Sequence, residues 1–289
     1  PPTPETVAAM VAELGGDAER LEARVPPRWG NLTREVLAIN MVLAGCTPAY
    51  APVVRAAMLA LCSSHFNLNG IQTTTHMAAP LLVVNGPVRA AIGMNAGANV
   101  FGSGNRANAT IGRAIRLVLL NVGGAWPGDL DKSTLGHPGK YSFCIAENEE
   151  ASPWAPYHVE QGYRPGDSTV FCIATEGPHS VTNHVADDPQ GVLDSIVSAM
   201  STIAHNNAVS SGACAVVIGP EHAITLNDDG SIHLATSVCE IGNGSNTVLA
   251  QMAAEVLGVP MEKIMVVFGD TDVIPMGWGA RASRNTAIG

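Results

Sequence analysis

The sequence is poor in aromatic residues and in positive charge. It contains only five Phe, four Tyr and four Trp among 289 residues, and 15 Lys and Arg against 25 Asp and Glu give a formal net charge of −10. Proteins that bind nucleic acids need a basic face for the phosphates, and often aromatic side chains on which bases stack. The composition therefore argues against a nucleic-acid partner.

The chain also lacks a long hydrophobic run. No stretch of about 18 uncharged apolar residues is present, so we expect no membrane-spanning helix. No secretory signal pattern opens the chain, which begins P-P-T-P without an initiator Met and so indicates truncation or processing. Hydrophobic residues make up 46% of the sequence, a proportion typical of a globular protein. We expect a cytoplasmic protein without a membrane segment.

The six cysteines are few and widely scattered, and none forms a C-x-x-C pair. This spacing favours unpaired, packed thiols in a reducing compartment over a disulfide framework or a zinc site. Two of the six lie in F-C-I-A segments that are typical of buried strands. The six are Cys46, Cys62, Cys144, Cys172, Cys214 and Cys239.

Apolar segments of helical and of strand type succeed one another along the chain. Helical spacing covers 4–25, 33–44, 48–62 and 189–205, and a Gly- and Asn-rich loop runs into a further apolar helix that ends near residue 121. Apolar strands are expected at 81–85, 141–146, 169–174 and 214–219. The pattern predicts an α/β fold, with α+β as the alternative, in which helices are layered on a mixed sheet.

A change of pattern near 219–225 predicts a domain boundary. The apolar strand ending at Gly219 is followed by A-I-T-L, the turn residues N-D-D-G and the alternating segment S-I-H-L-A-T, which together indicate a hairpin. We therefore expect an α/β domain at 1–223 and a partial second α+β domain at 224–289.

The Gly- and Asn-rich loop 93–112 is the first candidate site. Arg106 and Arg113 lie at the start of the helix that follows it, where arginine and backbone N–H groups suit a phosphate or a carboxylate. The loop has neither the Walker pattern nor the G-x-G-x-x-G pattern. The alternative is a plain turn in which the Asn side chains satisfy their own backbone.

Carboxylates and histidines follow two of the predicted strands. Glu147 begins E-N-E-E after the first F-C-I-A segment, and Glu176 begins E-G-P-H-S-V-T-N-H after the second. If the strands are neighbours, both carboxylates lie at one edge of the sheet, with His137, His158 and His179 within reach. We predict Glu147, Glu176 and His179 as catalytic residues.

The second of these loops also suits a metal ion. Glu176, His179 and His184 offer ligands for zinc or iron, although the spacing allows a common metal without requiring it. The alternatives are a solvated acidic loop at Glu147 and structural histidines in the second loop.

The last sixty residues carry the most specific motif. A strand-like segment leads into C-E-I-G-N-G-S-N-T-V-L-A-Q-M-A-A-E-V-L-G, and G-D-T-D and A-S-R-N-T-A-I-G follow a second strand-like segment. This combination resembles the molybdopterin-binding domain of the xanthine dehydrogenase and aldehyde oxidase large subunit. The resemblance covers about 224–289 and implies an oxidoreductase.

The resemblance also implies which residues contact the cofactor, a molybdenum–molybdopterin. By position in the family's motifs these are Gly242, Asn243, Gly244, Thr247, Gln251 and Ser283. Asn243 departs from the family, which has Gln there, and its amide is one methylene shorter. The family's catalytic glutamate and its preceding cofactor domain have no counterpart in this sequence. We therefore expect a partial large subunit, inactive alone, that acts on a small-molecule substrate together with other subunits or with the remainder of the large subunit.

Residues 1–223 resemble an uncharacterised bacterial protein family, through V-P-P-R-W-G, L-L-V-V-N-G-P, H-P-G-K-Y-S-F-C-I-A-E-N-E-E and T-E-G-P-H-S-V-T-N-H. This resemblance implies no activity. The residues themselves leave open an alternative function for this segment: a metal-assisted hydrolase or lyase in which Arg106 and Arg113 bind a small anionic substrate.

Overall fold

The computed structural model describes residues 1–186, 188–202, 214–227, 232–236, 245–257 and 260–268. The chain divides into two compact units. The first comprises Pro1–Glu150 and Ala155–Pro178, and the second comprises Ala151–Trp154 and His179–Gly289.

The first unit combines helices with two small sheets. Its elements are α1 (Pro4–Glu13), β1 (Leu21–Val25), β2 (Gly30–Thr33), α2 (Arg34–Ala44), η1 (Pro48–Tyr50), α3 (Ala51–Leu61), α4 (Leu68–Thr73), β3 (Ala79–Asn85), α5 (Val88–Ala91), α6 (Arg106–Asn121), η2 (Pro138–Lys140), β4 (Cys144–Ala146), α7 (Tyr157–Glu160) and β5 (Thr169–Thr175).

Local signals in the sequence set the ends of several of these helices. Thr3 caps α1 with its side chain and Pro4 occupies the first helical turn, as predicted. The predicted helix over 4–25 is too long, because α1 ends at Glu13 and Leu21–Val25 is a strand. Gly15 and Gly16 lie between α1 and β1, and their positive φ values of 92° and 67° turn the chain out of the helical conformation.

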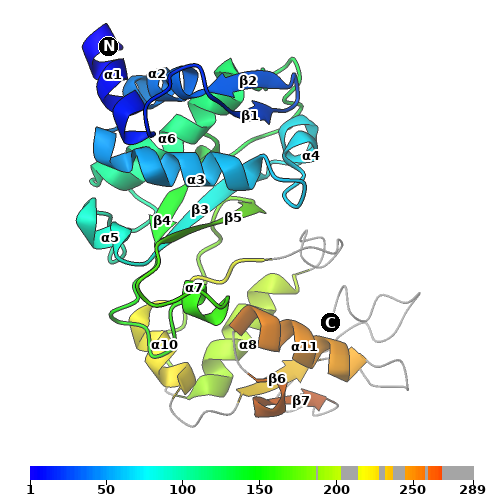
Figure 1. Cartoon of the computed structure of the whole chain (residues 1–289). Helices are drawn as coiled ribbons and strands as arrows, with labels where there is room; N and C mark the ends of the chain where they lie inside the picture. The colour runs from blue at the N-terminus through cyan, green and yellow to red at the C-terminus, as the bar shows by residue number, and fades with distance from the viewer. Residues whose placement is uncertain (187, 203–213, 228–231, 237–244, 258–259, 269–289) are drawn as a thin grey trace. The chain divides into compact units, whose positions relative to one another are not determined.

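The three-stranded sheet of this unit is mixed, with β3 at its centre. β4 runs parallel to β3 and β5 runs antiparallel to it. The two F-C-I-A segments thus flank one strand from both sides, since Leu82 pairs with Cys144 on one side and with Cys172 on the other. Figure 1 shows α3 and α6 lying over one face of this sheet.

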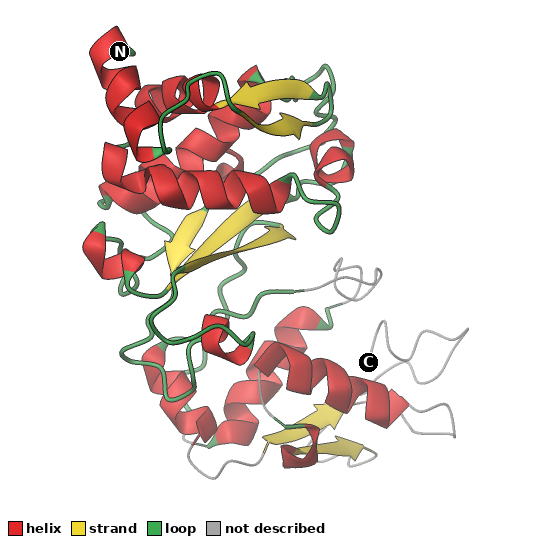
Figure 2. Cartoon of the chain, viewed as in Figure 1, coloured by secondary structure: helices red, strands yellow, loops and turns green. Residues whose placement is uncertain are grey.

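Alternation along β3 divides the apolar residues between the two faces of the sheet. Leu82 and Val84 belong to the main core with residues of α2, α3 and α6, such as Val54 and Ile111, whereas Leu81 packs in a smaller cluster with Phe143 and Ile173. Figure 2 shows α2, α3 and α6 on one side of the sheet, with α3 next to it. The predicted fold class, helices layered on a mixed sheet, is confirmed.

The second unit contains a parallel strand pair joined by a helix. Its elements are α8 (Pro189–Met200), α10 (Pro220–Asn227), β6 (Ile232–Thr236), α11 (Ser245–Leu257), η3 (Met261–Lys263) and β7 (Ile264–Phe268). Val192, Leu193 and Leu226 form its buried core, against which Ile264 of β7 packs.

Two local predictions for this unit were wrong. Residues 214–219 form no strand, although all of them are small or apolar. The segment after them is helix α10 rather than the first arm of a hairpin, and β6 pairs with β7 instead. The domain boundary predicted at 223/224 stays a prediction.

No single helix of the described segments is both long and apolar enough to cross a membrane. One helix pair, Arg34–Ala44 with Pro48–Leu61, meets the criteria of length and composition together, but it is bent by 118°.

Candidate functional site

The two predicted cofactor loops follow the strands of the parallel pair β6–β7 in the sequence. Thr236 and Phe268 are the last residues of β6 and β7, and they are paired. Because the strands are parallel, the segments that follow them begin side by side. The predicted ligands Gly242, Asn243, Gly244 and Ser283 belong to these segments and lie outside the described residues.

The first turns of α11 contain the two described ligands of the prediction. Thr247 and Gln251 are both exposed and stand four residues apart on one side of the helix, while Leu249 and Ala250 are buried. No acidic residue lies in the first turn of α11, so that turn itself places no carboxylate at the positive end of the helix. The hydroxyl and amide groups of Thr247 and Gln251 suit a polar, anionic cofactor such as molybdopterin.

In the first unit, β3 and β4 end together at a polar cluster. Asn85, the last residue of β3, is fully buried and donates its amide to Glu147, which follows β4. Glu147 also accepts a 3.0 Å hydrogen bond from the backbone N–H of Tyr157. As predicted, Glu147 lies at the carboxyl end of its strand.

Glu149 and His158 complete this cluster, which we call the Glu147 cluster (Asn85, Arg89, Glu147, Glu149 and His158). Glu149 accepts a 2.7 Å hydrogen bond from the N–H of Gly86 and pairs with the buried Arg89 at 2.8 Å. His158 is 2% exposed, with Nδ1 3.9 Å from Oε1 of Glu149. Neither ring nitrogen of His158 has a hydrogen-bond partner among the described residues.

Glu176 lies at the opposite end of the sheet from Glu147. Because β5 is antiparallel to β3, its last residue, Thr175, pairs with Ala79 at the start of β3. The seven residues of β3 separate the two ends by about 20 Å at the usual rise of a strand. The prediction that Glu147 and Glu176 share one edge was therefore wrong, since it required β4 and β5 to run in the same direction.

Histidines lie beside Glu176 at its end of the sheet. His76 Nε2 lies 2.5 Å from Oε1 of Glu176. His137 accepts a hydrogen bond from the N–H of Gly139 at Nδ1 and stands edge-on to Phe143. Burial, and then the charge of Lys140, lower the pKa of His137, so this imidazole is neutral at pH 7.

No three His, Cys, Asp or Glu side chains of the described residues are grouped in a way that would hold a metal ion. Glu176, His179 and His184, all within the described part of the chain, therefore form no such group. The predicted zinc or iron site has no structural support. The catalytic roles of Glu147, Glu176 and His179 stay predictions.

The Gly- and Asn-rich loop satisfies its own backbone. Asn105 caps α6 by accepting from the N–H of Asn108, and Asn108 in turn bonds both backbone groups of Asn95 at 2.9 Å. Arg106 donates from Nε and Nη2 to the carbonyl of Gly45, at the end of α2. These contacts agree with the alternative of a plain turn whose Asn side chains bond to the backbone. Anion binding by Arg106 and the half-buried Arg113 stays a prediction.

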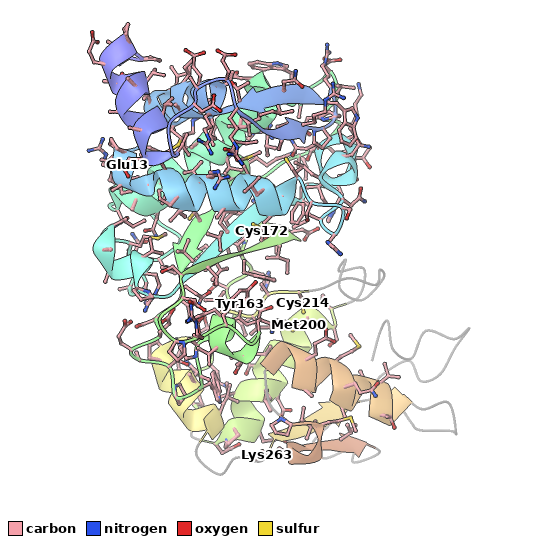
Figure 3. The ribbon with its side chains drawn as sticks, in the orientation of Figure 1. Glu13, Tyr163, Cys172, Met200, Cys214 and Lys263 are labelled. Atoms are coloured by element: carbon pink, nitrogen blue, oxygen red, sulfur yellow. The ribbon has the colours of Figure 1, made fainter. Side chains whose placement is uncertain are left out.

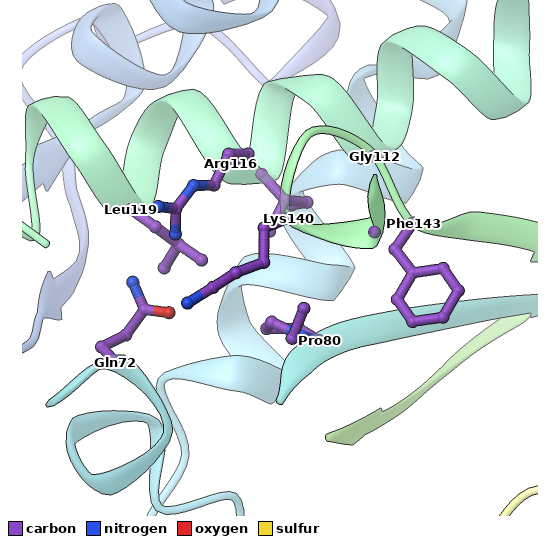
Figure 4. A pocket seen from close by; sticks show the side chains of 10 residues that line it. Gln72, Pro80, Gly112, Arg116, Leu119, Lys140 and Phe143 are labelled. Carbon is purple, nitrogen blue, oxygen red and sulfur yellow. The ribbon is translucent and has the colours of Figure 1, made fainter. Parts of the chain in front are cut away.

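Sequence reasoning missed a buried ionic group near η2. Asp131 accepts hydrogen bonds from Lys140 and from Arg116, and these two cations line a small cavity together with Gln72 (Figure 4). The three charged residues are spread over 25 positions on a helix and two loops, and no short motif links them. Only the H-P-G-K segment before β4 marked part of this group in the sequence.

The described cysteines are free, as predicted. Cys144 is buried in β4, and Cys172 lies on β5 beneath α3 (Figure 3), with its sulfur 4.0 Å from the carbonyl of Ala57. Burial raises the pKa of Cys46 and Cys62 to about 11. These thiols are therefore packing groups rather than nucleophiles or metal ligands.

Comparison with known proteins relates the C-terminal part of the chain to a cofactor-binding domain. The family model of the molybdopterin cofactor-binding domain matches residues 195–289. The putative xanthine dehydrogenase molybdenum-binding subunit XdhA of Escherichia coli is 42% identical over 66 residues, which are 22% of this chain and 9% of that subunit. The aldehyde oxidoreductase molybdenum-binding subunit PaoC of Escherichia coli is 40% identical over 65 residues, again 22% of this chain and 9% of the relative.

More distant relatives match over the same length. The carbon monoxide dehydrogenase large chain of Afipia carboxidovorans is 36% identical over 63 residues, which are 22% of this chain and 8% of that protein. No solved structure matches. The matches confirm the resemblance of the C-terminal part to the molybdopterin-binding domain, and they span about a tenth of the length of each of these relatives.

Proposed function

We propose that residues 195–289 bind the molybdenum cofactor as one part of a molybdenum hydroxylase large subunit. The observation that carries this proposal is the match of these residues to the molybdopterin cofactor-binding domain. The parallel pair β6–β7 supports it, because both strands end at one edge. The start of α11, with exposed Thr247 and Gln251 and no acidic residue in its first turn, supplies hydrogen-bonding groups that suit an anionic cofactor.

We further propose that this segment binds and orients the cofactor but does not turn over substrate alone. When bound, the cofactor supplies the oxidative hydroxylation of an aldehyde or heterocycle. The segment matches only 9% of the length of XdhA and PaoC, so most of the wall of a cofactor site would come from other segments or subunits. A cofactor held from one side keeps much of its hydration and binds weakly.

Molybdenum content tests this proposal. The full chain is co-expressed with the cofactor biosynthesis and insertion proteins of a molybdenum hydroxylase, and molybdenum per chain is measured by mass spectrometry, with the released pterin measured by fluorescence. We expect both signals in the purified chain. Absence of both after co-expression would contradict cofactor binding.

Two substitutions locate the binding groups. Thr247→Val and Gln251→Leu each remove a hydrogen-bonding side chain at the start of α11. At about 0.5–1.5 kcal/mol for each bond, they should lower the affinity for the cofactor about twofold to tenfold. Gln161→Leu makes the matched change at an exposed residue of the first unit and should leave molybdenum content unchanged.

A second candidate function is hydrolase or lyase chemistry on a small anionic substrate in residues 1–223. The Glu147 cluster favours it, because His158 is buried beside Glu149 and its ring nitrogens have no hydrogen-bond partner in the described structure. An imidazole next to carboxylates suits proton transfer. A screen of small esters, amides and carboxylic acids should give activity that His158→Gln and Glu147→Gln abolish and Gln161→Leu retains. Activity that survives in both variants would remove this candidate.

A further inference from the structure

A small cavity lies between α6, η2 and the start of β3. Its volume is about 10 Å³, which is room for one water molecule or one small ion. Figure 4 shows the side chains of Gln72, Arg116 and Lys140 turned toward one another at this cavity. The rest of the lining is apolar or glycine: Ala79, Pro80, Gly112, Ile115, Leu119, Gly139 and Phe143.

The charges around the cavity do not balance. Lys140 Nζ donates to both carboxylate oxygens of Asp131 at 2.9 Å, and Arg116 Nη2 donates to Oδ2 at 3.1 Å. Burial opposes the charged form of Asp131, but the hydrogen bonds from Lys140, Ser133 and Arg116 outweigh it and lower its pKa. Asp131 is therefore ionised, and its charge together with those of Arg116 and Lys140 gives a local net charge of +1. This charge has little contact with water, because the side chains of Arg116 and Lys140 are only 9% and 13% exposed.

Gln72 adds a donor that nothing in the described structure uses. This residue of α4 is 3% exposed, and its amide nitrogen is buried without a hydrogen-bond acceptor among the described residues. A buried donor left unsatisfied costs about 1–3 kcal/mol. Lysine and arginine have donors and no acceptors, and Gln72 has one acceptor beside its amide donors, so most of the polar groups at the cavity call for an occupant that accepts hydrogen bonds.

We propose that this cavity binds a single small monovalent anion of about the size of chloride, held by Gln72, Arg116 and Lys140. The local positive charge favours an anion over a neutral water molecule, and the apolar lining strengthens the attraction because it lowers the local dielectric constant. The volume excludes sulfate, phosphate and larger oxyanions. The bound anion would fix α4 and the η2 segment against α6.

Bromide identifies the occupant directly. Crystals of the full chain grown in sodium bromide should show an anomalous peak at the bromine edge within hydrogen-bonding distance of Arg116, Lys140 and Gln72. The same cavity with no anomalous signal, filled by water or empty, would overturn the proposal.

Thermal unfolding measures the effect in solution. At equal ionic strength, sodium chloride and bromide should raise the unfolding temperature of the first unit, with saturation, relative to sodium gluconate, whose monovalent anion is too large for the cavity. Equal unfolding temperatures in all three salts would contradict a halide site, because general screening does not depend on the size of the anion in this way.

Two substitutions at Gln72 assign the response to this cavity. Gln72→Glu places a carboxylate where the anion would lie and should abolish the halide response, whereas Gln72→Met removes the amide without adding charge and should weaken halide binding about tenfold. Gln161→Glu makes the same charge change on an exposed residue and should keep the full response. If Gln72→Glu does not fold, Gln72→Met decides: a halide response equal to that of the unmodified chain would overturn the proposal.

Discussion

Arg34 donates a 2.6 Å hydrogen bond from Nε to Oε1 of Glu22, and both side chains are almost fully buried. The other carboxylate oxygen of Glu22 accepts from Arg55 of α3 at 2.8 Å. Arg34 also donates to the carbonyls of Gly15 and Gly16 after α1. One buried carboxylate thus ties the β1–β2 hairpin to α2 and α3.

Removing the charge of Glu22 should destabilise the first unit. Glu22→Gln leaves two arginines with one neutral partner, and Arg34 would stay buried without its counter-ion. Breaking a buried ion pair on one side costs about 3–5 kcal/mol. We expect the free energy of unfolding, measured in urea, to fall by about that amount.

Glu19→Gln is the control for this change. Glu19 is exposed on the same connection between α1 and β1, and its substitution should change stability by less than about 0.5 kcal/mol. Equal effects of the two substitutions would show that the buried pair does not stabilise the fold.

The same carboxylates predict loss of stability in acid. For both Glu22 and Asp131 burial opposes ionisation, but hydrogen bonds from arginine or lysine outweigh it and hold the pKa below the usual values of 4.5 and 3.8. A depressed pKa in the folded state contributes stability above the unfolded pKa, and this stability is lost as the pH falls through the folded pKa. The urea midpoint should therefore hold from pH 7 to about 5 and fall below about pH 4.

A substitution at Asp131 distinguishes the contribution of this carboxylate to acid sensitivity from the general effect of low pH. In Asp131→Asn the fall of the urea midpoint between pH 5 and pH 3 should be smaller, from a lower starting stability at pH 7. An acid-induced fall of the same size in Asp131→Asn and in the unmodified chain would count against the role of this group.

The sequence predicted those parts of the fold that depend on local signals. Helices α2, α3 and α6 and strands β3 and β5 follow from apolar spacing within a few positions. The direction of β5 could not be predicted in this way, because strand direction depends on the path of about 80 residues between β3 and β5 rather than on the strands themselves. Because β5 runs antiparallel to β3, Glu176 lies at the opposite end of the sheet from the end that was predicted.

For the candidate sites too, the sequence predicted what depends on neighbouring residues but not which distant residues the fold brings together. Glu147 was predicted at a strand end because its neighbours F-C-I-A are contiguous with it. Asn85 and Arg89, which contact Glu147 in the structure, and His158, which lies near Glu149, come from two separate segments and have no common motif. In α10 a different cause applied: the position of A-I-T-L before the turn residues N-D-D-G favoured a hairpin arm, yet the segment packs as a helix on α8.

The buried thiols of Cys46 and Cys144 and the half-buried thiols of Cys62 and Cys172 should resist alkylation in the native protein. Burial raises the pKa of Cys46 and Cys62 to about 11 and of Cys172 to about 12, and it also raises the pKa of Cys144. At pH 8 only about one thiol in a thousand is ionised at a pKa of 11. Mass spectrometry after brief iodoacetamide treatment should find these four residues unmodified in the native chain and modified in guanidinium. Native labelling as fast as that of the denatured chain would refute their burial.

Gly112 permits the close approach of α6 to the segment that enters β4. A methyl group at this position would lie 2.6 Å from the backbone nitrogen of Phe143 and would also contact Ser142 Oγ. Within a helix, alanine is about 1 kcal/mol more favourable than glycine, but displacing the backbone before β4 costs about 1–3 kcal/mol. Gly112→Ala should therefore lower stability in urea by up to about 2 kcal/mol, whereas Gly166→Ala, where a methyl group meets nothing within 4 Å, should be neutral. A stabilised Gly112→Ala variant would mean that helix propensity outweighs this contact and that α6 does not pack so closely on the sheet.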